Sequence, residues 1–197
     1  MNVLHDKLVI ASNNKHKLRE IREILGTRFP HIFSLAEIGI DVEIAETGAT
    51  FLENARIKAK TIVGMTGLPA LADDSGLEVC ALNGAPGVYS ARYAGEPCDH
   101  DKNNEKLLKA LEGVNDRRAA FVSVIMVCFP DGSEVYTEAR AEGEILTAPR
   151  GTGGFGYDPV FLSKDLDITF AEATSAQKNS VGHRGRAVNN LLKLLEI

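Results

Sequence analysis

Apolar and polar positions follow one another along the first part of the chain in a strand-then-helix pattern. Residues 7–11 form a short apolar run, which predicts a buried strand. Polar residues 12–14 follow, and apolar residues then recur at helical spacing from Leu18 to Leu25. The first predicted structure is therefore a strand, a polar turn and a helix.

A second helix is predicted to begin at residues 50–53, Thr-Phe-Leu-Glu, which have the S/T-x-x-E form of a capping box. Its apolar residues recur on one helical face: Phe51, Leu52, Ala55, Ala59 and Ile62. Residues 68–73 form the next apolar run and predict a strand that ends in acidic residues.

The second half of the chain adds a helix, a hairpin and a closing helix. Residues 99–111 predict a helix, and residues 187–195 predict an amphipathic one. Residues 119–129 and 134–141 are strand-like and flank the turn signal Pro130-Asp131-Gly132, which predicts an antiparallel hairpin. Strand–helix units combined with a hairpin favour an α/β fold with a mixed sheet.

Composition places the chain among folded globular proteins. With 197 residues, 44% hydrophobic and 25% charged, we expect a single domain over residues 1–197 with a substantial core. The net charge of −5 argues against a broad nucleic-acid surface, although a local group of cations can still bind a small anion.

Cysteine usage and apolar runs bear on the compartment. The spacing of Cys80, Cys98 and Cys128 fits no metal knuckle and favours reduced thiols in a cytosol. The N-terminal residues lack the apolar core of a signal peptide, and residues 119–129 are too few to span a bilayer. We therefore expect a cytoplasmic protein with no membrane partner.

Two neighbouring carboxylates and a hydroxyl stand in Asp73-Asp74-Ser75-Gly76, where the predicted strand ends. Such carboxylates can bind Mg²⁺ together with substrate phosphates, but Asp, Ser and Gly are also ordinary residues of a strand-ending turn. Adjacent side chains of a strand face opposite sides, so we expect one carboxylate to face the site. Glu46 is a candidate second carboxylate on the strength of its position alone.

The polar segment Ser12–Lys17 lies between the first strand and the first helix. Free backbone N–H groups, the helix dipole and two lysines would suit a phosphate. The same residues can equally serve as a helix cap with solvated lysines.

A glycine-rich segment, Gly151–Gly156, matches G-x-G-x-x-G literally. A dinucleotide fingerprint requires a following helix, whereas Tyr157-Asp158-Pro159 and a strand-like run at 160–162 come next. The segment also lacks the GK[ST] of a P-loop. Two interpretations stay open: a loop that receives a flat base against Phe155, or a tight loop with Phe155 in the core.

Positive charge gathers shortly before the closing helix, at Lys178, His183, Arg184 and Arg186. Cations are unfavourable near a helix N-terminus, so an anionic ligand or a carboxylate would explain them. A solvated basic surface is the alternative.

Taken in order, these motifs resemble the inosine-triphosphate pyrophosphatase family, whose bacterial members are dITP/XTP pyrophosphatases. The resemblance runs from about residue 8 to the C-terminus. It rests on SNNKHK (12–17), ETGATFLENARIKA (46–59), ADDSG (72–76), GAPGVYSARY (84–93), GTGGFGYDP (151–159) and HRGRA (183–187).

The resemblance implies an enzyme that hydrolyses dITP, ITP and XTP to the monophosphate and pyrophosphate. It further implies Mg²⁺ as cofactor, a homodimer, and a long mixed twisted sheet with helices on both sides. It also implies two lobes with the active site in the cleft between them.

Roles carried over by matching position divide the site into parts. Asp74 would bind Mg²⁺ and act as the general base, and Ser75 would contact substrate. The triphosphate would be held by Ser12, Asn13, Asn14, Lys15, His16 and Lys17. The base and sugar would be surrounded by Phe155, Gly156, Tyr157, Asp158, Lys178, His183 and Arg184.

One departure concerns the second metal ligand. Several relatives have two acidic residues before the Thr-Gly, whereas this chain has Ala45-Glu46, in which Glu46 matches the second of the pair. If the first is the metal ligand in those relatives, Glu46 or Glu43 would have to substitute for it. Three other functions stay open: a related pyrophosphatase for modified pyrimidine or methylated nucleotides, a non-catalytic nucleotide-binding regulator, and an RNA-binding module.

Overall fold

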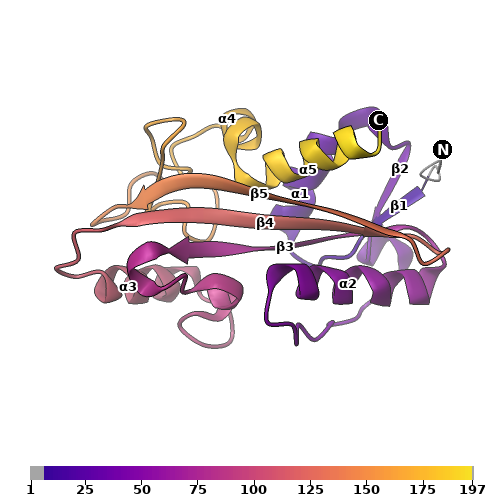
Figure 1. The fold of residues 1–197 in the computed structure, drawn as a ribbon, viewed down its shortest axis with the longest axis horizontal. Helices are drawn as coiled ribbons and strands as arrows, with labels where there is room; N and C mark the ends of the chain where they lie inside the picture. Colours follow the sequence, from indigo (N-terminus) through magenta and orange to yellow (C-terminus); the bar gives the residue numbers. More distant parts are fainter. Residues whose placement is uncertain (1–6, 197) are drawn as a thin grey trace. The chain divides into compact units, whose positions relative to one another are not determined.

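The computed structural model describes residues 7–196, and these contain a six-stranded sheet (Figure 1). Its strand order is β2-β1-β3-β4-β5-β6. β1 pairs in parallel with β2 and with β3, while β5 and β6 are antiparallel. The predicted mixed α/β sheet is therefore confirmed. The strands are β1 (Lys7–Ile10), β2 (His31–Ser34), β3 (Ala70–Val79), β4 (Arg118–Cys128), β5 (Glu134–Ile145) and β6 (Phe161–Ser163).

Helices connect and flank these strands. The α-helices are α1 (Lys15–Leu25), α2 (Phe51–Thr66), α3 (His100–Ala110), α4 (Ser175–Val181) and α5 (His183–Leu194). Short 3₁₀ turns occupy Gly26–Arg28, Ala36–Ile38, Cys80–Leu82 and Gly87–Arg92.

Side-chain caps explain where several helices begin. The Asn14 side chain accepts hydrogen bonds from the backbone of His16 and Lys17 at the start of α1. Thr50 and Glu53 form the expected capping box of α2. Asp99 caps α3. Because these residues satisfy the free N–H groups of a first turn, helix starts read from sequence at these three places are confirmed.

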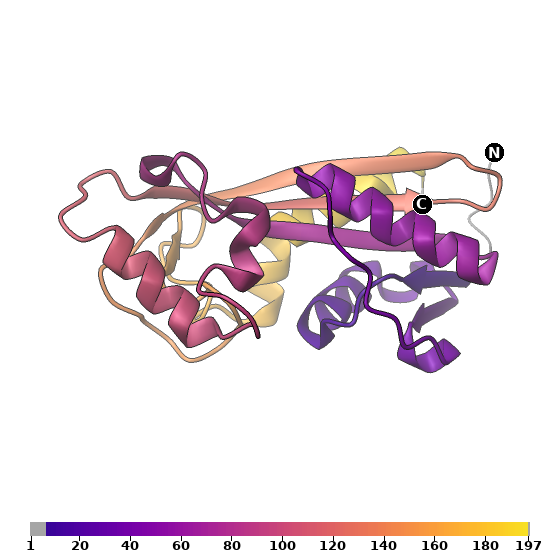
Figure 2. The same cartoon turned by 90° about the horizontal axis from the view of Figure 1, so that it is seen from below.

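The chain divides into two compact units. The first takes in the described residues up to Asp74, residues 123–138 and the described residues from Ala187 onward. In this unit α2 covers one face of the strands, and α1 with the end of α5 lies on the other (Figures 1 and 2). Fully buried apolar side chains fill both interfaces: Leu8, Ile10, Ile21, Leu25, Ile62 and Leu71.

The second unit consists of Ser75–Val122 and Ala139–Arg186. Here α3 lies on one side of the strands and α4 on the other (Figure 1). Its core contains an aromatic group in which Phe121 packs edge-on against Phe161, with ring centroids 4.7 Å apart, and stacks on Phe170. Leu77, Leu107 and other apolar residues surround these rings.

The predicted strand ending at Asp73 is too short. β3 continues through Ser75 and Gly76 to Val79, so the acidic pair lies inside the strand rather than at its end. Buried Leu77 and Val79 alternate with half-buried Glu78, which is an ordinary strand pattern. The strand was predicted to end too early because Asp, Ser and Gly, which precede this pattern, are common turn residues.

The structure confirms the predicted hairpin and corrects the start of the closing helix. β4 and β5 are neighbours joined by a turn in which Gly132 N–H donates to Phe129, which confirms the hairpin. The closing helix starts at His183 rather than residue 187, and β2 and α4 were not predicted. No helix within residues 7–196 is long and apolar enough to cross a membrane. The expectation about a signal peptide concerns Met1–Lys7, of which residues 1–6 lie outside the described residues.

Candidate active site

The two neighbouring aspartates of β3 face opposite sides of the sheet, as the strand geometry predicts. Asp74 meets Lys58 of α2, with Nζ 2.8 Å from Oδ1. Asp73 meets Lys17 of α1, with Nζ 2.8 Å from Oδ2. Since α1 and α2 cover opposite faces, each carboxylate has its own lysine (Figure 1).

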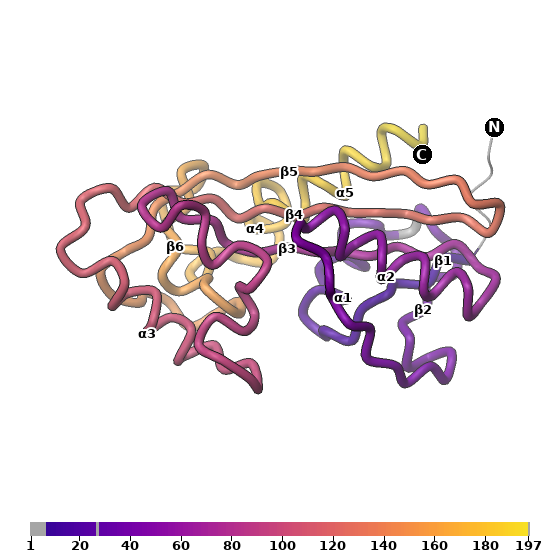
Figure 3. The backbone as a smooth tube through the Cα atoms, turned by 60° about the horizontal axis from the view of Figure 1, so that its bottom comes forward, coloured from indigo at the N-terminus to yellow at the C-terminus, as the bar shows by residue number. Residues whose placement is uncertain are grey.

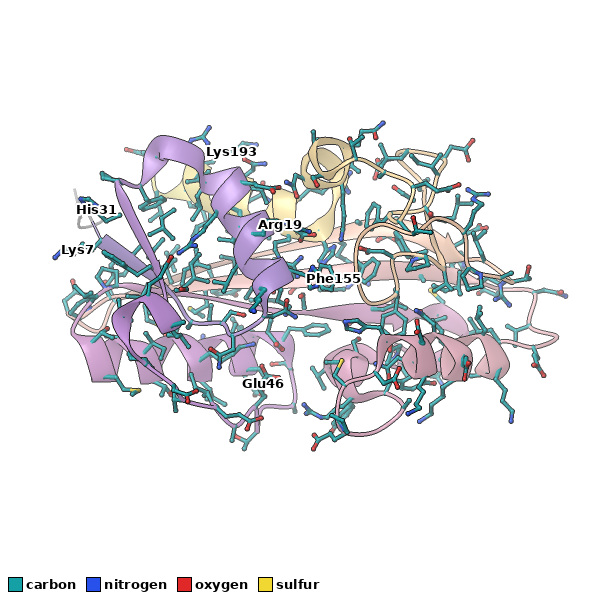
Figure 4. The ribbon with its side chains drawn as sticks, turned by 180° about the vertical axis from the view of Figure 1, so that it is seen from behind. Lys7, Arg19, His31, Glu46, Phe155 and Lys193 are labelled. Carbon is teal, nitrogen blue, oxygen red and sulfur yellow. The ribbon has the colours of Figure 1, made fainter. Side chains whose placement is uncertain are left out.

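Lys58 joins three parts of the chain. Its ammonium donates to Glu46 Oε1 at 2.7 Å, to Asp74 Oδ1 at 2.8 Å and to the Asp73 carbonyl at 2.8 Å. Glu46, labelled in Figure 4, lies on the irregular segment that leads into α2. The path of this segment can be seen in Figure 3. The two carboxylate oxygens therefore lie within two hydrogen-bond lengths of each other. We call Lys17, Glu46, Lys58, Asp73 and Asp74 the carboxylate–lysine cluster.

Burial and charge act against each other in this cluster. Burial raises the pKa of Asp74 above its ordinary value, even though Lys58 and Lys17 oppose the rise. Burial is also the largest effect on Lys58 and favours its neutral form. The charges of Asp74 and Glu46 together outweigh it and hold the pKa of Lys58 above its ordinary value. Asp74 is thus a stronger proton acceptor than an ordinary aspartate, beside a lysine that stays charged.

The polar turn before α1 forms the helix cap that one of its two interpretations expects, but not all of its lysines are solvated. Asn14 caps the helix, and Asn13 Nδ2 donates to the Val42 carbonyl at 3.0 Å. Lys15 and His16 are exposed, as the cap interpretation expects. Lys17, however, is mostly buried and ion-paired, so this lysine is part of the cluster rather than a solvated cation.

In the second unit, Asp158 anchors the glycine-rich loop. Its Oδ2 accepts from the Phe155 backbone N–H at 2.8 Å and from Lys178 Nζ at 2.6 Å. A Cβ on Gly154 would come within 2.1 Å of that same oxygen, and the φ of Gly154 is +71°, so only glycine fits there. No helix follows the loop, which confirms that it is not a dinucleotide fingerprint.

Two cations lie near the Phe155 ring. Lys178 Nζ stands 4.6 Å from the ring centroid, and the Arg184 guanidinium carbon stands 6.0 Å from it. The ring is half-buried rather than in the core. Figure 4 labels this residue. The His183 ring stacks on Phe121 with centroids 4.8 Å apart. We call Phe155, Asp158, Lys178, His183 and Arg184 the aromatic–cation cluster.

A solvated basic surface is wrong for three of the four cations before the closing helix. Lys178, His183 and Arg184 are all buried. Lys178 pairs with Asp158, and Arg184 Nη2 donates to Ser75 Oγ at 2.8 Å. Arg186 is only half-buried and pairs with Asp165. Buried cations need such partners because desolvation is costly.

The remaining predicted residues of the loop are held by α3 and the 3₁₀ turn at Gly87–Arg92. Asn104 Nδ2 donates to the Gly156 carbonyl at 3.0 Å, and the Tyr157 hydroxyl donates to the Ser90 carbonyl at 2.8 Å. Tyr157 is buried, and this burial raises the pKa of its hydroxyl. Gly156 and Tyr157 therefore support the loop.

Sequence reasoning missed Lys58, although a signal was present. In α2 the buried side includes Phe51, Ala55, Ala59 and Ile62, and Lys58 falls on the same helical side. A lysine on an apolar helix side needs a buried anionic partner, and Asp74 is that partner. Sequence reasoning also missed Ser123 of β4, whose hydroxyl donates to Asp73 Oδ1 in the same cluster.

Asp74 of β3 belongs to the first unit, and the next residue, Ser75, belongs to the second, where it accepts a hydrogen bond from Arg184. Among the described residues, no group of three or more His, Cys, Asp and Glu could hold a metal. Two converging carboxylates, Glu46 and Asp74, still suit Mg²⁺, which is usually bound through one or two carboxylates plus phosphates. The structure is thus that of an α/β protein with a carboxylate–lysine cluster in its first unit and an aromatic–cation cluster in its second.

The chain belongs to the Ham1 family, whose model matches residues 8–194. It is 50% identical over 192 residues to a dITP/XTP pyrophosphatase of Bacillus licheniformis, covering 96% of this chain and 98% of that one. It is 46% identical over 196 residues to the dITP/XTP pyrophosphatase of Bacillus subtilis, covering 98% and 99%.

Solved structures agree in fold. The Ham1 protein of Staphylococcus aureus superposes with a TM-score of 0.87 at 44% identity, over 96% of this chain and 98% of that one. A nucleoside-triphosphatase / dITP/XTP pyrophosphatase of Mycobacterium abscessus gives 0.77 at 44% identity, over 94% and 98%. The resemblance drawn from the motifs is confirmed.

Proposed function

We propose that this protein hydrolyses nucleoside triphosphates with deaminated purine bases, dITP, ITP and XTP, to the monophosphate and pyrophosphate. The observation that carries the proposal is the carboxylate–lysine cluster, in which Lys58 holds Asp74 and Glu46 together. The names of the relatives, dITP/XTP pyrophosphatases at about half identity over nearly the full chain, support the choice of substrate.

Asp74 is proposed as the general base. Its burial raises its pKa, so it accepts a proton from water more readily than an ordinary aspartate does. Lys58 holds the carboxylate in one orientation from α2. In that position Asp74 would direct a water molecule at the α-phosphorus and take up its proton.

Lysines are proposed to bind the triphosphate. Lys17 presents its charge at the start of α1, where the helix dipole also favours anions. Lys15, two residues earlier in the chain, is exposed and adds a second positive charge. Ser12, Asn13, Asn14 and His16 complete this segment. Charge neutralisation by such groups is the main protein contribution to phosphoryl transfer.

Mg²⁺ is proposed as the cofactor, held by Asp74 and Glu46. When bound, it would neutralise charge on the phosphate oxygens of the substrate and of the leaving pyrophosphate. Glu46 is preferred over Glu43 as the second ligand because Glu46 already converges with Asp74 on Lys58, whereas Glu43 is exposed.

The aromatic–cation cluster is proposed to receive the base and sugar. Phe155 supplies a half-buried ring for stacking. His183, Arg184 and Lys178 supply donors suited to the 6-keto oxygen of a deaminated purine, and Ser75 is held by Arg184. Adenine has a 6-amino group there, which would leave such donors unsatisfied, so ATP should be a poor substrate.

A triphosphate panel with pyrophosphate detection, run with and without Mg²⁺, tests the proposal. We expect Mg²⁺-dependent release from dITP, ITP and XTP and little from ATP. A preference for modified pyrimidine or methylated nucleotides would favour the related pyrophosphatase instead. Absence of turnover on every triphosphate would contradict the enzyme assignment.

The Asp74→Asn variant tests the base within the same assay. It should lose turnover almost completely while still binding nucleotide, because the amide keeps the shape but accepts no proton at neutral pH. A kcat near that of the wild type would exclude Asp74 as the base. A homodimer is also proposed, on the family resemblance, and light scattering of the purified protein tests it.

A further inference from the structure

One buried hydroxyl interrupts the apolar interior of β4. Between Ala119 and Cys128 the strand is apolar except for Ser123, which is fully buried. A buried hydroxyl is costly unless it forms a hydrogen bond. The partner of Ser123 therefore indicates why a serine stands there.

That partner is Asp73 of the neighbouring strand. Ser123 Oγ donates to Asp73 Oδ1 at 2.6 Å, a short bond of the charge-assisted kind. The other oxygen, Oδ2, lies 2.8 Å from Lys17 Nζ. The Asp73 side chain is 0% exposed and that of Lys17 is 17% exposed. A continuous polar chain thus runs from β4 through β3 to α1.

We propose that Ser123 is a positioning residue for the triphosphate: it fixes Asp73, which in turn holds the Lys17 ammonium in its binding orientation. This inference rests on the proposed function. A hydroxyl on one oxygen and an ammonium on the other prevent the carboxylate from rotating. A lysine side chain has many rotamers, so a fixed counter-charge reduces the entropy lost when phosphate binds.

Ser123 acts through Lys17 in this scheme, so its removal should weaken phosphate binding more than the chemical step. In Ser123→Ala, KM for dITP should rise on the order of tenfold with kcat changed by less than about threefold, as expected for loss of a hydrogen bond to a charged group. Affinity for inorganic tripolyphosphate should fall by a similar factor. Calorimetry measures this binding directly and does not depend on turnover.

A double-mutant cycle with Lys17→Met separates positioning from general damage. If Ser123 acts through Lys17, Ser123→Ala should change kcat/KM and tripolyphosphate affinity by less than about twofold in the Lys17→Met background. Equal losses in both backgrounds would overturn the proposal. So would an unchanged KM and tripolyphosphate affinity in the single variant.

Conservative and control variants keep the test decisive. Ser123→Thr retains the hydroxyl and should recover binding to within about threefold. Ser123→Cys is a weak donor of similar size and should reproduce the Ala defect even where Ala folds poorly. Ser163→Ala removes another fully buried hydroxyl, in β6, and should leave tripolyphosphate affinity unchanged. A wild type without turnover would contradict the proposed function, while the calorimetric cycle would still test the positioning role.

Discussion

Replacing Lys58 by Met tests whether one ammonium holds the carboxylate–lysine cluster together. The variant keeps the length of the side chain but leaves Glu46 and Asp74 facing each other without the cation. Breaking a buried ion pair costs about 3–5 kcal/mol. The Glu46 side chain is 29% exposed and can turn toward water, so we expect the lower end, about 3 kcal/mol at pH 8 without metal. This lowers the folded-to-unfolded ratio by roughly a hundredfold.

The stability lost in Lys58→Met should become smaller as pH falls. Burial raises the folded-state pKa of Asp74, and loss of Lys58 raises it further because the lysine opposes that rise. A carboxylate with a raised folded-state pKa stabilises the fold at low pH, and that stabilisation is lost as pH rises through the folded pKa. The Lys58→Met deficit should therefore shrink between pH 8 and pH 5.5.

Urea unfolding followed by circular dichroism at both pH values measures this deficit. Lys60→Met is the matched control on the same helix, because the Lys60 side chain is 59% exposed and pairs with Glu134 at 3.3 Å. That change should cost less than about 1 kcal/mol. A Lys58→Met variant as stable as the Lys60 control at pH 8, or a deficit that grows toward pH 5.5, would refute the reasoning.

Three further predictions concern other parts of the chain. Arg184→Met should lower the ratio of kcat/KM for ITP over ATP because it removes a donor beside Phe155, and an unchanged ratio would count against that role. Glu37 has a pKa lowered to about 2 by the Ser34 backbone N–H and by Arg22. Since the Glu37 side chain is 49% exposed, Glu37→Gln should lower the free energy of unfolding by only about 1 kcal/mol at pH 7. This stability difference between wild type and variant should be present above pH 4.5 and be lost as pH falls toward 2. A stability difference that does not change with pH during acid unfolding would contradict this. Thr50→Ala should cost about 1 kcal/mol through loss of the capping box, and Thr50→Ser almost nothing; equal unfolding midpoints for the two variants would be inconsistent with a capping role.

Local signals in the sequence were sufficient for several helix starts. Thr50 with Glu53, Asn14 and Asp99 each satisfy N–H groups within a few residues, so nothing distant is needed to form these caps. The hairpin around Pro130-Asp131-Gly132 is local in the same way. Such elements depend on neighbours in sequence and could be predicted from it.

β3 shows where local reasoning fails. Asp, Ser and Gly are turn residues by propensity, yet Asp73, Asp74 and Ser75 lie inside a strand. Hydrogen bonds and ion pairs from distant parts of the sequence offset the cost of burying these polar side chains. They come from Lys17, Lys58, Ser123 and Arg184. Tertiary contacts therefore outweigh the turn propensity.

By itself, the sequence determined the class of fold, the places where several helices begin and the family, and it singled out Asp73-Asp74-Ser75-Gly76 as a candidate site. It did so because periodicity, caps and motifs are properties of neighbouring residues. Only the tertiary structure decided that Asp73 pairs with Lys17, that Lys58 joins Glu46 to Asp74, and that Lys178, His183 and Arg184 are buried. Electrostatic pairing and desolvation depend on distance in space, which the order of residues alone does not contain.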